Sequence, residues 1–119
     1  ERPQAVHLVA SGSTLATWKR HYAADWKWLN GLAAAQRLLV ISVDIHRNES
    51  DAFFTGGFPL HEATSSGAAV RDAVSVGKRR RNYGLLDIDS AAVRITLFAD
   101  DRAESQWNRN LSRTTWLPI

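Results

Sequence analysis

The stretch LLVISVDIHRNES, residues 38–50, decides how this chain is expected to fold. Its first six residues, Leu38 to Val43, form a mainly apolar run with several β-branched side chains. Such a run predicts a strand buried on both faces, because a strand with one solvated face alternates apolar and polar residues. A strand of this kind needs a packing layer on each side. We therefore expect a layered α/β fold.

A helix is predicted before this strand. Its apolar residues recur at intervals of three and four, which places them on one helical face. The pair Asn30–Gly31 is expected to end or kink the helix, because glycine costs about 1 kcal/mol relative to alanine in a helix interior. The residues of the apolar face are Trp18, Tyr22, Trp26, Leu29 and Ala33.

Further strands are predicted on either side. VHLVA at residues 6–10 is a short apolar run that stops at a turn, and FPLHEAT at residues 58–64 is a second strand, with Pro59 at its start or at an edge. In residues 83–99, YGLLDIDSAAVRITLFA, apolar and polar residues alternate on both sides of a short link, which predicts a β-hairpin with one buried face. Residues 68–78 are expected to form a loop or a short helix.

The composition limits the classes of protein to consider. Of the 119 residues, 45% are hydrophobic and 23% are charged, which is typical of a single globular domain. The absence of cysteine excludes disulfides and thiolate zinc sites. No apolar run approaches the roughly 18 residues that cross a bilayer, so no membrane partner is expected. The net charge of +3 weakly favours anionic partners, and no specific nucleic-acid partner is expected.

The polar residues after the apolar run form the first candidate site. Asp44 and His46 are two residues apart, so on an extended chain both side chains point to the same side. If the strand ends there, both lie over its carboxyl edge, where α/β sheets place ligand sites. A carboxylate with an imidazole suits a divalent metal or a general acid–base pair. The alternative is a polar strand end that faces solvent.

Other clusters each have a functional and a structural interpretation. TSSG, residues 64–67, is either a turn that presents N–H groups to an anion or an ordinary turn whose side chains bond locally. KRRR, residues 78–81, is either a phosphate-binding cluster or a solvated group of charges that shields a sheet edge. His61 and His7 lie inside apolar runs, which favours hydrogen-bonded core histidines over metal ligands.

Three stretches together resemble the carboxy-terminal part of the PhoD-like metallophosphatases, a branch of the calcineurin-like phosphoesterase superfamily. They are LLVISVDIH at residues 38–46, FPLHEATSSG at residues 58–67 and RNYGLLDIDSAAVRITLF at residues 81–98. Their order and spacing are similar to those of the family. The resemblance extends over most of the chain.

The resemblance implies a fold and a chemistry. The fold is α/β, a partial metallophosphoesterase-like α/β/β/α sandwich with a carboxy-terminal β-hairpin. The chemistry is hydrolysis of phosphate esters at a two-metal centre of iron, calcium, manganese or zinc, in which the metals activate a water and hold the phosphoryl oxygens. His46 falls on the metal-ligand histidine of the motif and Asp44 on its acid. No catalytic role is carried over to Ser65, Ser66 or His61, and family members are often exported.

Two departures from the family pattern limit this reading. Val43 replaces a glycine of the motif, and a β-branched residue resists the positive φ that glycine adopts. The amino-terminal motifs that supply most metal ligands in the family have no counterpart here. We therefore expect residues 1–119 to be a single domain that forms the carboxy-terminal portion of a larger phosphatase-like protein and is inactive alone. The alternative is a non-catalytic α/β binding module.

The remaining expectations concern partners. Half of a two-sheet sandwich exposes apolar surface, so we expect a rearranged fold or self-association, with Phe53, Phe54 and Phe58 as candidates for the exposed patch. An anion or nucleic-acid binder that uses residues 78–81 is the weakest alternative, because no aromatic-rich basic face accompanies them.

Overall fold

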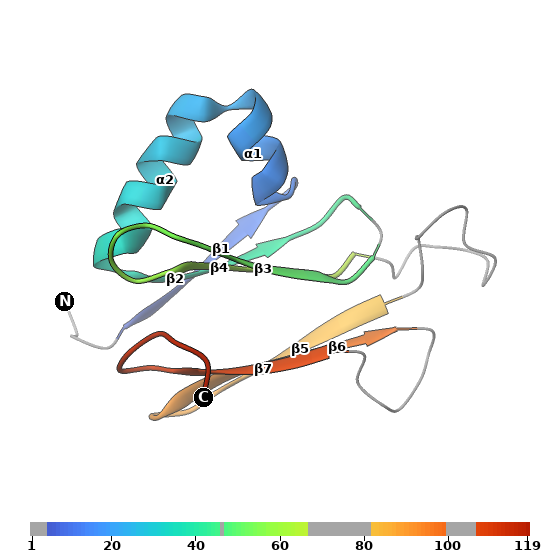
Figure 1. Ribbon diagram of the computed structural model, residues 1–119. Helices are drawn as coiled ribbons and strands as arrows, with labels where there is room; N and C mark the ends of the chain where they lie inside the picture. Colours follow the sequence, from blue (N-terminus) through green and yellow to red (C-terminus); the bar gives the residue numbers. More distant parts are fainter. Residues whose placement is uncertain (1–4, 46, 67–81, 100–106) are drawn as a thin grey trace.

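Figure 1 shows the computed structural model of the chain, which describes residues 5–45, 47–66, 82–99 and 107–119. Its two helices and seven strands form a helical layer, a central four-stranded sheet and a three-stranded sheet. The elements are β1 (Val6–Ser11), α1 (Leu15–His21), α2 (Ala23–Ala35), β2 (Arg37–Ser42), β3 (Glu49–Phe53), β4 (Leu60–Thr64), β5 (Asn82–Ile88), β6 (Ala92–Ala99) and β7 (Trp107–Ser112).

The central sheet is mixed, with the strand order β1-β2-β4-β3. Strands β1, β2 and β4 run parallel, and β3 runs antiparallel to β4. The register places Ser11 beside Ser42 and Ser42 beside Thr64. Three parallel strands therefore end together at one edge of the sheet, which we call the carboxyl edge.

Strand β2 is buried on both faces, as its apolar run predicts. Leu38 and Val40 pack toward the helices, whereas Leu39 packs toward the second sheet. The alternation follows from the pleat of a strand, which points successive side chains to opposite faces. The helix-side core is completed by Leu15, Leu29, Ala33 and Leu60, and the core between the sheets by Ala63, Val93, Ile95, Leu97, Leu111 and Trp116.

The helical layer differs from the prediction in one respect. Gly31 lies inside α2, so the expected interruption at Asn30–Gly31 is wrong. The break occurs at Tyr22, which ends α1 and precedes α2 with φ −131° and ψ 58°. This break turns the side chain of Tyr22 away from the core, and it is 55% exposed. Figure 1 shows the resulting angle between the two helices.

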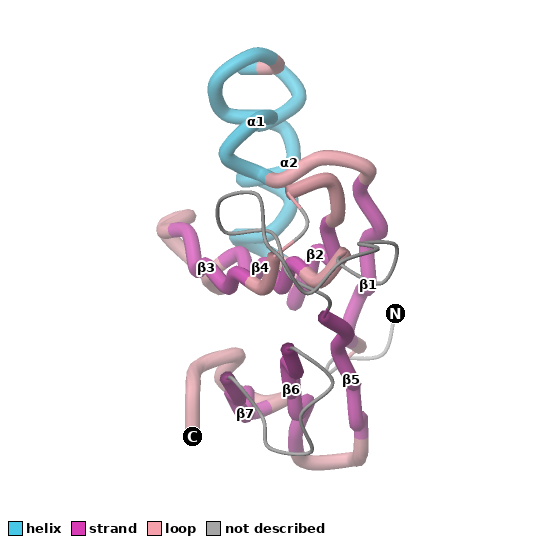
Figure 2. The backbone as a smooth tube through the Cα atoms, turned by 90° about the vertical axis from the view of Figure 1, so that its right-hand side faces the viewer, coloured by secondary structure: helices cyan, strands magenta, loops and turns pink. Residues whose placement is uncertain are grey.

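The second sheet is antiparallel, with the order β5-β6-β7. The predicted hairpin is confirmed as β5 and β6, and the buried face of β6 carries Val93, Ile95 and Leu97. Strand β7 extends this hairpin into a sheet, so the hairpin is not the last element. Figure 2 shows the two sheets stacked, with β5 below β1 and β7 below β3.

Sequence patterns missed two strands, β3 and β7. Their sequences, ESDAF and WNRNLS, are mostly polar and show no sustained apolar alternation. Each strand pairs along one side with a strongly patterned neighbour, β4 or β6. The backbone of that neighbour, not the local sequence, makes these segments extended.

Trp116 closes the core between the sheets. It is fully buried although its φ of 61° is rare for a residue with a side chain. Its indole Nε1 donates to the carbonyl of Leu38 at 3.2 Å, and its own carbonyl lies 2.8 Å from Nε2 of His61. A left-handed backbone costs roughly 1–3 kcal/mol, which burial of the large ring offsets.

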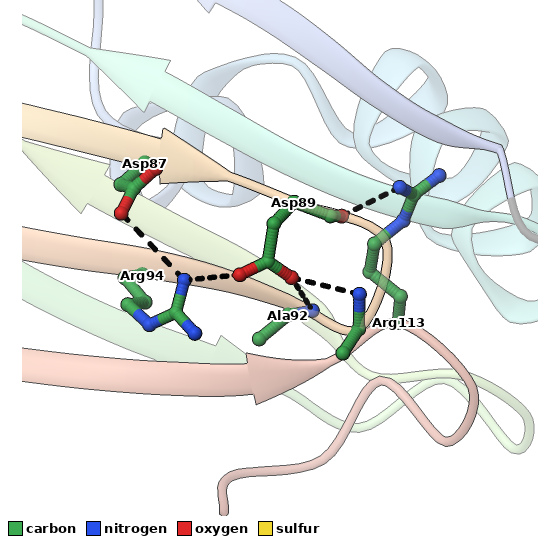
Figure 3. A network of polar contacts seen from close by, with 6 residues as sticks. Asp87, Asp89, Ala92, Arg94 and Arg113 are labelled. Carbon is green, nitrogen blue, oxygen red and sulfur yellow. Dashed lines mark hydrogen bonds and ion pairs between the residues drawn. The ribbon is translucent and has the colours of Figure 1, made fainter.

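The hairpin turn between β5 and β6 is built around Asp89 (Figure 3). One carboxylate oxygen of Asp89 accepts the backbone N–H groups of Ala91 at 2.7 Å and Ala92 at 2.9 Å. The other accepts a bond from Arg94 at 2.5 Å, and the carbonyl of Asp89 accepts one from Arg113 at 2.7 Å. The bond from Arg94 and those from the backbone lower the pKa of the Asp89 carboxyl to about 2.

The three phenylalanines expected to form an exposed patch are separated. Phe54 is 91% exposed. Phe53 packs against the helix-side core, with its ring 5.0 Å from that of Trp26, and Phe58 lies beneath the guanidinium of Arg37 at 4.4 Å. The proposed patch is therefore wrong. In the described part of the chain, neither helix is long and apolar enough to cross a membrane.

Gly57 allows the loop before β4 to approach the end of α2. A Cβ atom on Gly57 would lie 2.1 Å from the carbonyl oxygen of Ala34. That carbonyl also accepts the N–H of Phe58 at 3.1 Å, so the loop holds the last turn of α2 at this point. A side chain at Gly57 must push these two backbones apart.

We predict that Gly57→Ala destabilises the fold by about 1–3 kcal/mol, because backbone atoms have little room to move away from the added methyl group. Gly31→Ala is the matched control, since nothing lies within 4 Å of its added Cβ. In a helix interior this control should stabilise by about 0.5–1 kcal/mol. Urea denaturation of both variants checks the prediction, and equal effects at the two glycines contradict it.

A second prediction concerns the hairpin turn. Asp89→Ala should lower the melting temperature by several degrees, because it removes the bonds to two backbone N–H groups and to Arg94. Asp87→Ala is the control, since Asp87 reaches Arg94 only at 3.6 Å.

The depressed pKa of Asp89 adds stability above pH 3.8 that is lost as the pH falls toward about 2. Thermal melts of the natural chain between pH 2 and 7 test the pH dependence. Equal melting temperatures for Asp89→Ala and Asp87→Ala contradict the role of Asp89 in the turn.

Candidate functional site

Several polar residues lie at the carboxyl edge of the central sheet. Ser42 and Thr64 lie side by side there, with their hydroxyl oxygens 2.7 Å apart. Immediately beyond β2, the N–H of Val43 donates to the carbonyl of Ser11 at 3.2 Å. The chain then leaves the sheet through Asp44. Ligands of α/β proteins bind at such an edge, which makes it the candidate site.

Asp44 lies at this edge and is exposed to solvent. Its φ is 96°, in the left-handed region that aspartate and asparagine tolerate better than other residues with side chains. The unusual backbone angle of this segment thus falls on Asp44, and Val43 has no positive φ. His46, the second predicted metal ligand, lies outside the described residues.

A second polar cluster connects two of the stretches that carry the family resemblance, residues 58–67 and 81–98, with the loop that follows β2. The hydroxyl oxygen of Ser65 lies 2.8 Å from Oδ1 of Asn48 and 2.9 Å from Oδ1 of Asn82. Nδ2 of Asn48 donates to the carbonyl of Phe98 at 2.9 Å, which ties the cluster to β6. The loop after β2, the end of β4 and the start of β5 therefore meet at Ser65.

Gly84 lies next to this cluster. A Cβ atom there would lie 3.0 Å from Cδ2 of Leu97 and 3.6 Å from Cβ of Ser65. The glycine in the NYG stretch thus makes room mainly for the side chain of Leu97, and Ser65 packs beside it.

Two hollows border the cluster. The first, of about 210 Å³, lies between the sheets and includes Ser65 in its wall. The second, of about 260 Å³, includes Asn48 and Trp107. Leu97 contributes to both walls. The other described residues of the first wall are Ile41, Ala63, Gly84, Leu85, Leu86 and Ile95, so among the described residues only Ser65 gives this wall a polar side chain.

Glu62 is buried in the middle of β4, on the face that carries the helices. Its Oε1 accepts the backbone N–H of Leu15 at 2.9 Å and the hydroxyl of Ser42 at 2.6 Å. Burial raises the pKa of Glu62 above its ordinary value of 4.5, while these two bonds oppose the rise and the nearby carboxylates of Asp51 and Glu49 add to it. Glu62 therefore accepts a free N–H at the start of α1 and attaches the helical layer to the sheet.

His61 occupies the opposite face of β4, toward the second sheet. Its Nε2 lies 2.8 Å from the carbonyl of Trp116, and the two rings meet edge to face at 5.5 Å. Burial lowers its pKa, an effect that the bond to Trp116 opposes and the charge of Arg109 reinforces. The prediction of a hydrogen-bonded core histidine is confirmed for His61, and His7 is half-buried in β1.

The sequence-based site and the observed site overlap only in part. Asp44 was predicted and lies at the carboxyl edge, whereas Asn48, Asn82 and Glu62 were missed. One interpretation of the TSSG stretch was a turn whose side chains bond locally, yet the Ser65 hydroxyl bonds to residues 17 positions away on each side. Glu62 had a usable signal, a charge within a strand otherwise rich in apolar residues. The two asparagines had none, because only strand order brings them together.

The described residues can position and bond a ligand but do not form a metal centre by themselves. Within residues 5–45, 47–66, 82–99 and 107–119, no group of three or more His, Cys, Asp or Glu side chains is placed to hold a metal ion. At the carboxyl edge this part supplies the exposed carboxylate of Asp44, and near it the hydroxyl of Ser65 and two amides next to an apolar hollow. Residues 67–81, which include KRRR, lie outside the described residues.

Comparison with protein-family models, with curated proteins and with solved structures finds no match to this chain.

We predict that Glu62→Gln is at least as stable as the natural chain at pH 7, because Gln keeps the acceptor for Leu15 and Ser42 without burying a charge. A raised carboxyl pKa gives stability that is present below pH 4.5 and is lost as the pH rises through the folded-state pKa. The stability difference between the two proteins should therefore change above pH 4.5.

Urea denaturation at several pH values between 4 and 8 measures this difference. Asp87→Asn, an exposed acid on β5 that is not among the carboxylates acting on Glu62, is the control and should show little change. A Glu62→Gln protein that is clearly less stable at pH 7 would mean that the ionised carboxylate is needed for folding, contrary to the prediction.

Proposed function

We propose that this chain is part of a metal-dependent phosphatase or phosphodiesterase that hydrolyses phosphate esters, with His46 and Asp44 contributing metal ligands at the carboxyl edge. One observation supports this most. The Ser65 hydroxyl lies within hydrogen-bond distance of Asn48 and Asn82, so two of the stretches similar to the PhoD-like metallophosphatases, residues 58–67 and 81–98, meet beside the loop that follows the third, residues 38–46. Stretches that are separate in sequence and adjacent in space are typical of a functional site.

The layer order is compatible with this proposal. A helical layer, a mixed sheet and an antiparallel sheet correspond to three of the four layers of an α/β/β/α sandwich. The candidate ligands follow β2, the strand buried on both faces. The left-handed backbone at Asp44 turns the chain sharply where β2 ends, which favours a loop that can present side chains to a ligand.

The number of metal ligands in this chain limits the proposal. Asp44 alone cannot hold a two-metal centre, which takes several carboxylate and imidazole ligands. His46 would add an imidazole, and further ligands would have to come from another part of a larger protein. Metals bound there would polarise the phosphate ester and supply the attacking hydroxide. For this reason we expect the 119-residue chain to be inactive on its own.

The alternative is a non-catalytic α/β binding module. It is favoured by the missing metal-binding group in the described residues and by the apolar hollow beside Ser65. The two proposals differ in their response to metal, because a ligand that binds only the folded state raises its melting temperature.

The decisive experiment is thermal melting of the chain with added iron, manganese, zinc or calcium. We expect at least one metal to raise the midpoint by several degrees, and His46→Ala and Asp44→Asn to abolish the shift. Asn tolerates the positive φ at position 44 as well as Asp does, so Asp44→Asn tests the charge and not the backbone. Asp51→Asn should keep the full shift.

A longer chain containing this segment provides the activity test. Its hydrolysis of a chromogenic phosphate ester should depend on metal and fall at least a hundredfold in His46→Ala. If no metal shifts the melting midpoint of the segment and none supports hydrolysis by the longer chain, the phosphatase proposal is rejected in favour of the binding module.

A further inference from the structure

The free edges of the two sheets are not protected alike. Strand β3 carries the charges of Glu49 and Asp51, which disfavour pairing with another chain. The outer edge of β7 is covered by the last residues of the chain. There the N–H of Ser112 donates to the carbonyl of Leu117 at 2.9 Å, and the N–H of Ile119 donates to the carbonyl of Asn110 at 2.9 Å.

Strand β5 has neither form of protection in the part of the chain that is described. Three of its seven residues are large apolar side chains that are exposed, Tyr83 at 47%, Leu85 at 56% and Ile88 at 44%. Its single charge, Asp87, lies 3.6 Å from the guanidinium of Arg94 (Figure 3). The strand contains no proline or lysine. Such an edge is a template for pairing with another strand.

The backbone of β5 is also arranged for pairing. The N–H of Asp89 donates to the carbonyl of Ala92 at 3.1 Å, so these two residues form a hydrogen-bonded pair of the hairpin. Antiparallel pairs alternate between bonded and non-bonded, which leaves the N–H and C=O groups of Ile88, Leu86 and Gly84 directed at the free edge. A second strand can therefore bond to this edge without any rearrangement of the hairpin.

We propose that two copies of this chain pair through their β5 strands, antiparallel and about a two-fold axis at Leu85. Leu85 is the middle residue of the strand, so it would face Leu85 of the second copy. The same register places Gly84 opposite Leu86, both of which present free backbone groups. It also places Asp87 opposite Tyr83, whose hydroxyl can donate to the carboxylate.

This register is self-complementary in charge as well as in hydrogen bonding. A parallel alignment would place Asp87 opposite Asp87, whereas the antiparallel one separates the two carboxylates and gives each a donor. An interface related by a two-fold axis is closed, so pairing stops at two copies. The two antiparallel sheets become one continuous sheet. The proposal does not depend on metal binding or on phosphatase activity.

Molar mass measured by sedimentation at increasing concentration tests the pairing. The natural chain should approach twice its monomer mass of 13.3 kDa. Leu85→Lys should remain monomeric at every concentration, because a charge at the centre of the interface is placed against its own copy. Leu8→Lys is the matched control on the free edge of β1, where Leu8 is 48% exposed, and it should still dimerise. Thermal melts of both variants establish that they fold.

Cross-linking tests the register directly, because the chain contains no cysteine. Leu85 would form a non-hydrogen-bonded antiparallel pair, with Cα atoms about 4.5 Å apart. That separation lies within the range for disulfides. Under mild oxidation Leu85→Cys should form a disulfide-linked dimer at least tenfold faster than Leu8→Cys. A natural chain that is monomeric at all concentrations, a Leu85→Lys variant that still dimerises, or equal cross-linking at both positions overturns the proposal.

Discussion

The burial of β2 on both faces is the constraint on which the rest of the structure depends. Leu38, Leu39 and Val40 are successive residues with almost no exposed surface. Each contributes about 1.5–3 kcal/mol when it is buried, and the pleat divides them between two sides. Neither a helical layer nor a second sheet alone can cover them. The three-layer arrangement follows from this strand.

The layers are attached to β2 and its neighbour β4 by different means. On the helix side, the Glu62 carboxylate bonds to the first turn of α1 and to Ser42, so a polar group buried at a cost also orients the helix. On the other side, no strand pairing between the sheets is seen in the described residues, and the contact is made by side chains. Trp116 provides the most specific link, because it bonds to Leu38 and contacts His61.

The candidate site is a consequence of the same architecture. Parallel strands on both sides of a buried central strand must end at the same edge, and the chain must leave the sheet there. The polar residues Ser42 and Thr64 are buried at that edge and bond to each other, whereas Asp44 just beyond it is exposed. Ser65 follows β4 and donates to Asn82 at the start of β5, and this joins the edge of the first sheet to the start of the second.

The sequence by itself determined the strands whose patterns are strong: β1, β2, β4 and the β5–β6 hairpin, together with an apolar helical face and an edge that carries Asp44. These features are local, because the periodicity of apolar side chains and the residues of a turn act within one segment. Only the tertiary structure decided the strands β3 and β7, the break at Tyr22, the burial of Glu62 and the meeting of Ser65 with Asn48 and Asn82. Those features depend on the backbone of a neighbouring strand or on residues many positions away. Local propensity carries no information about such neighbours, because strand order and layer packing place them only after the chain has folded.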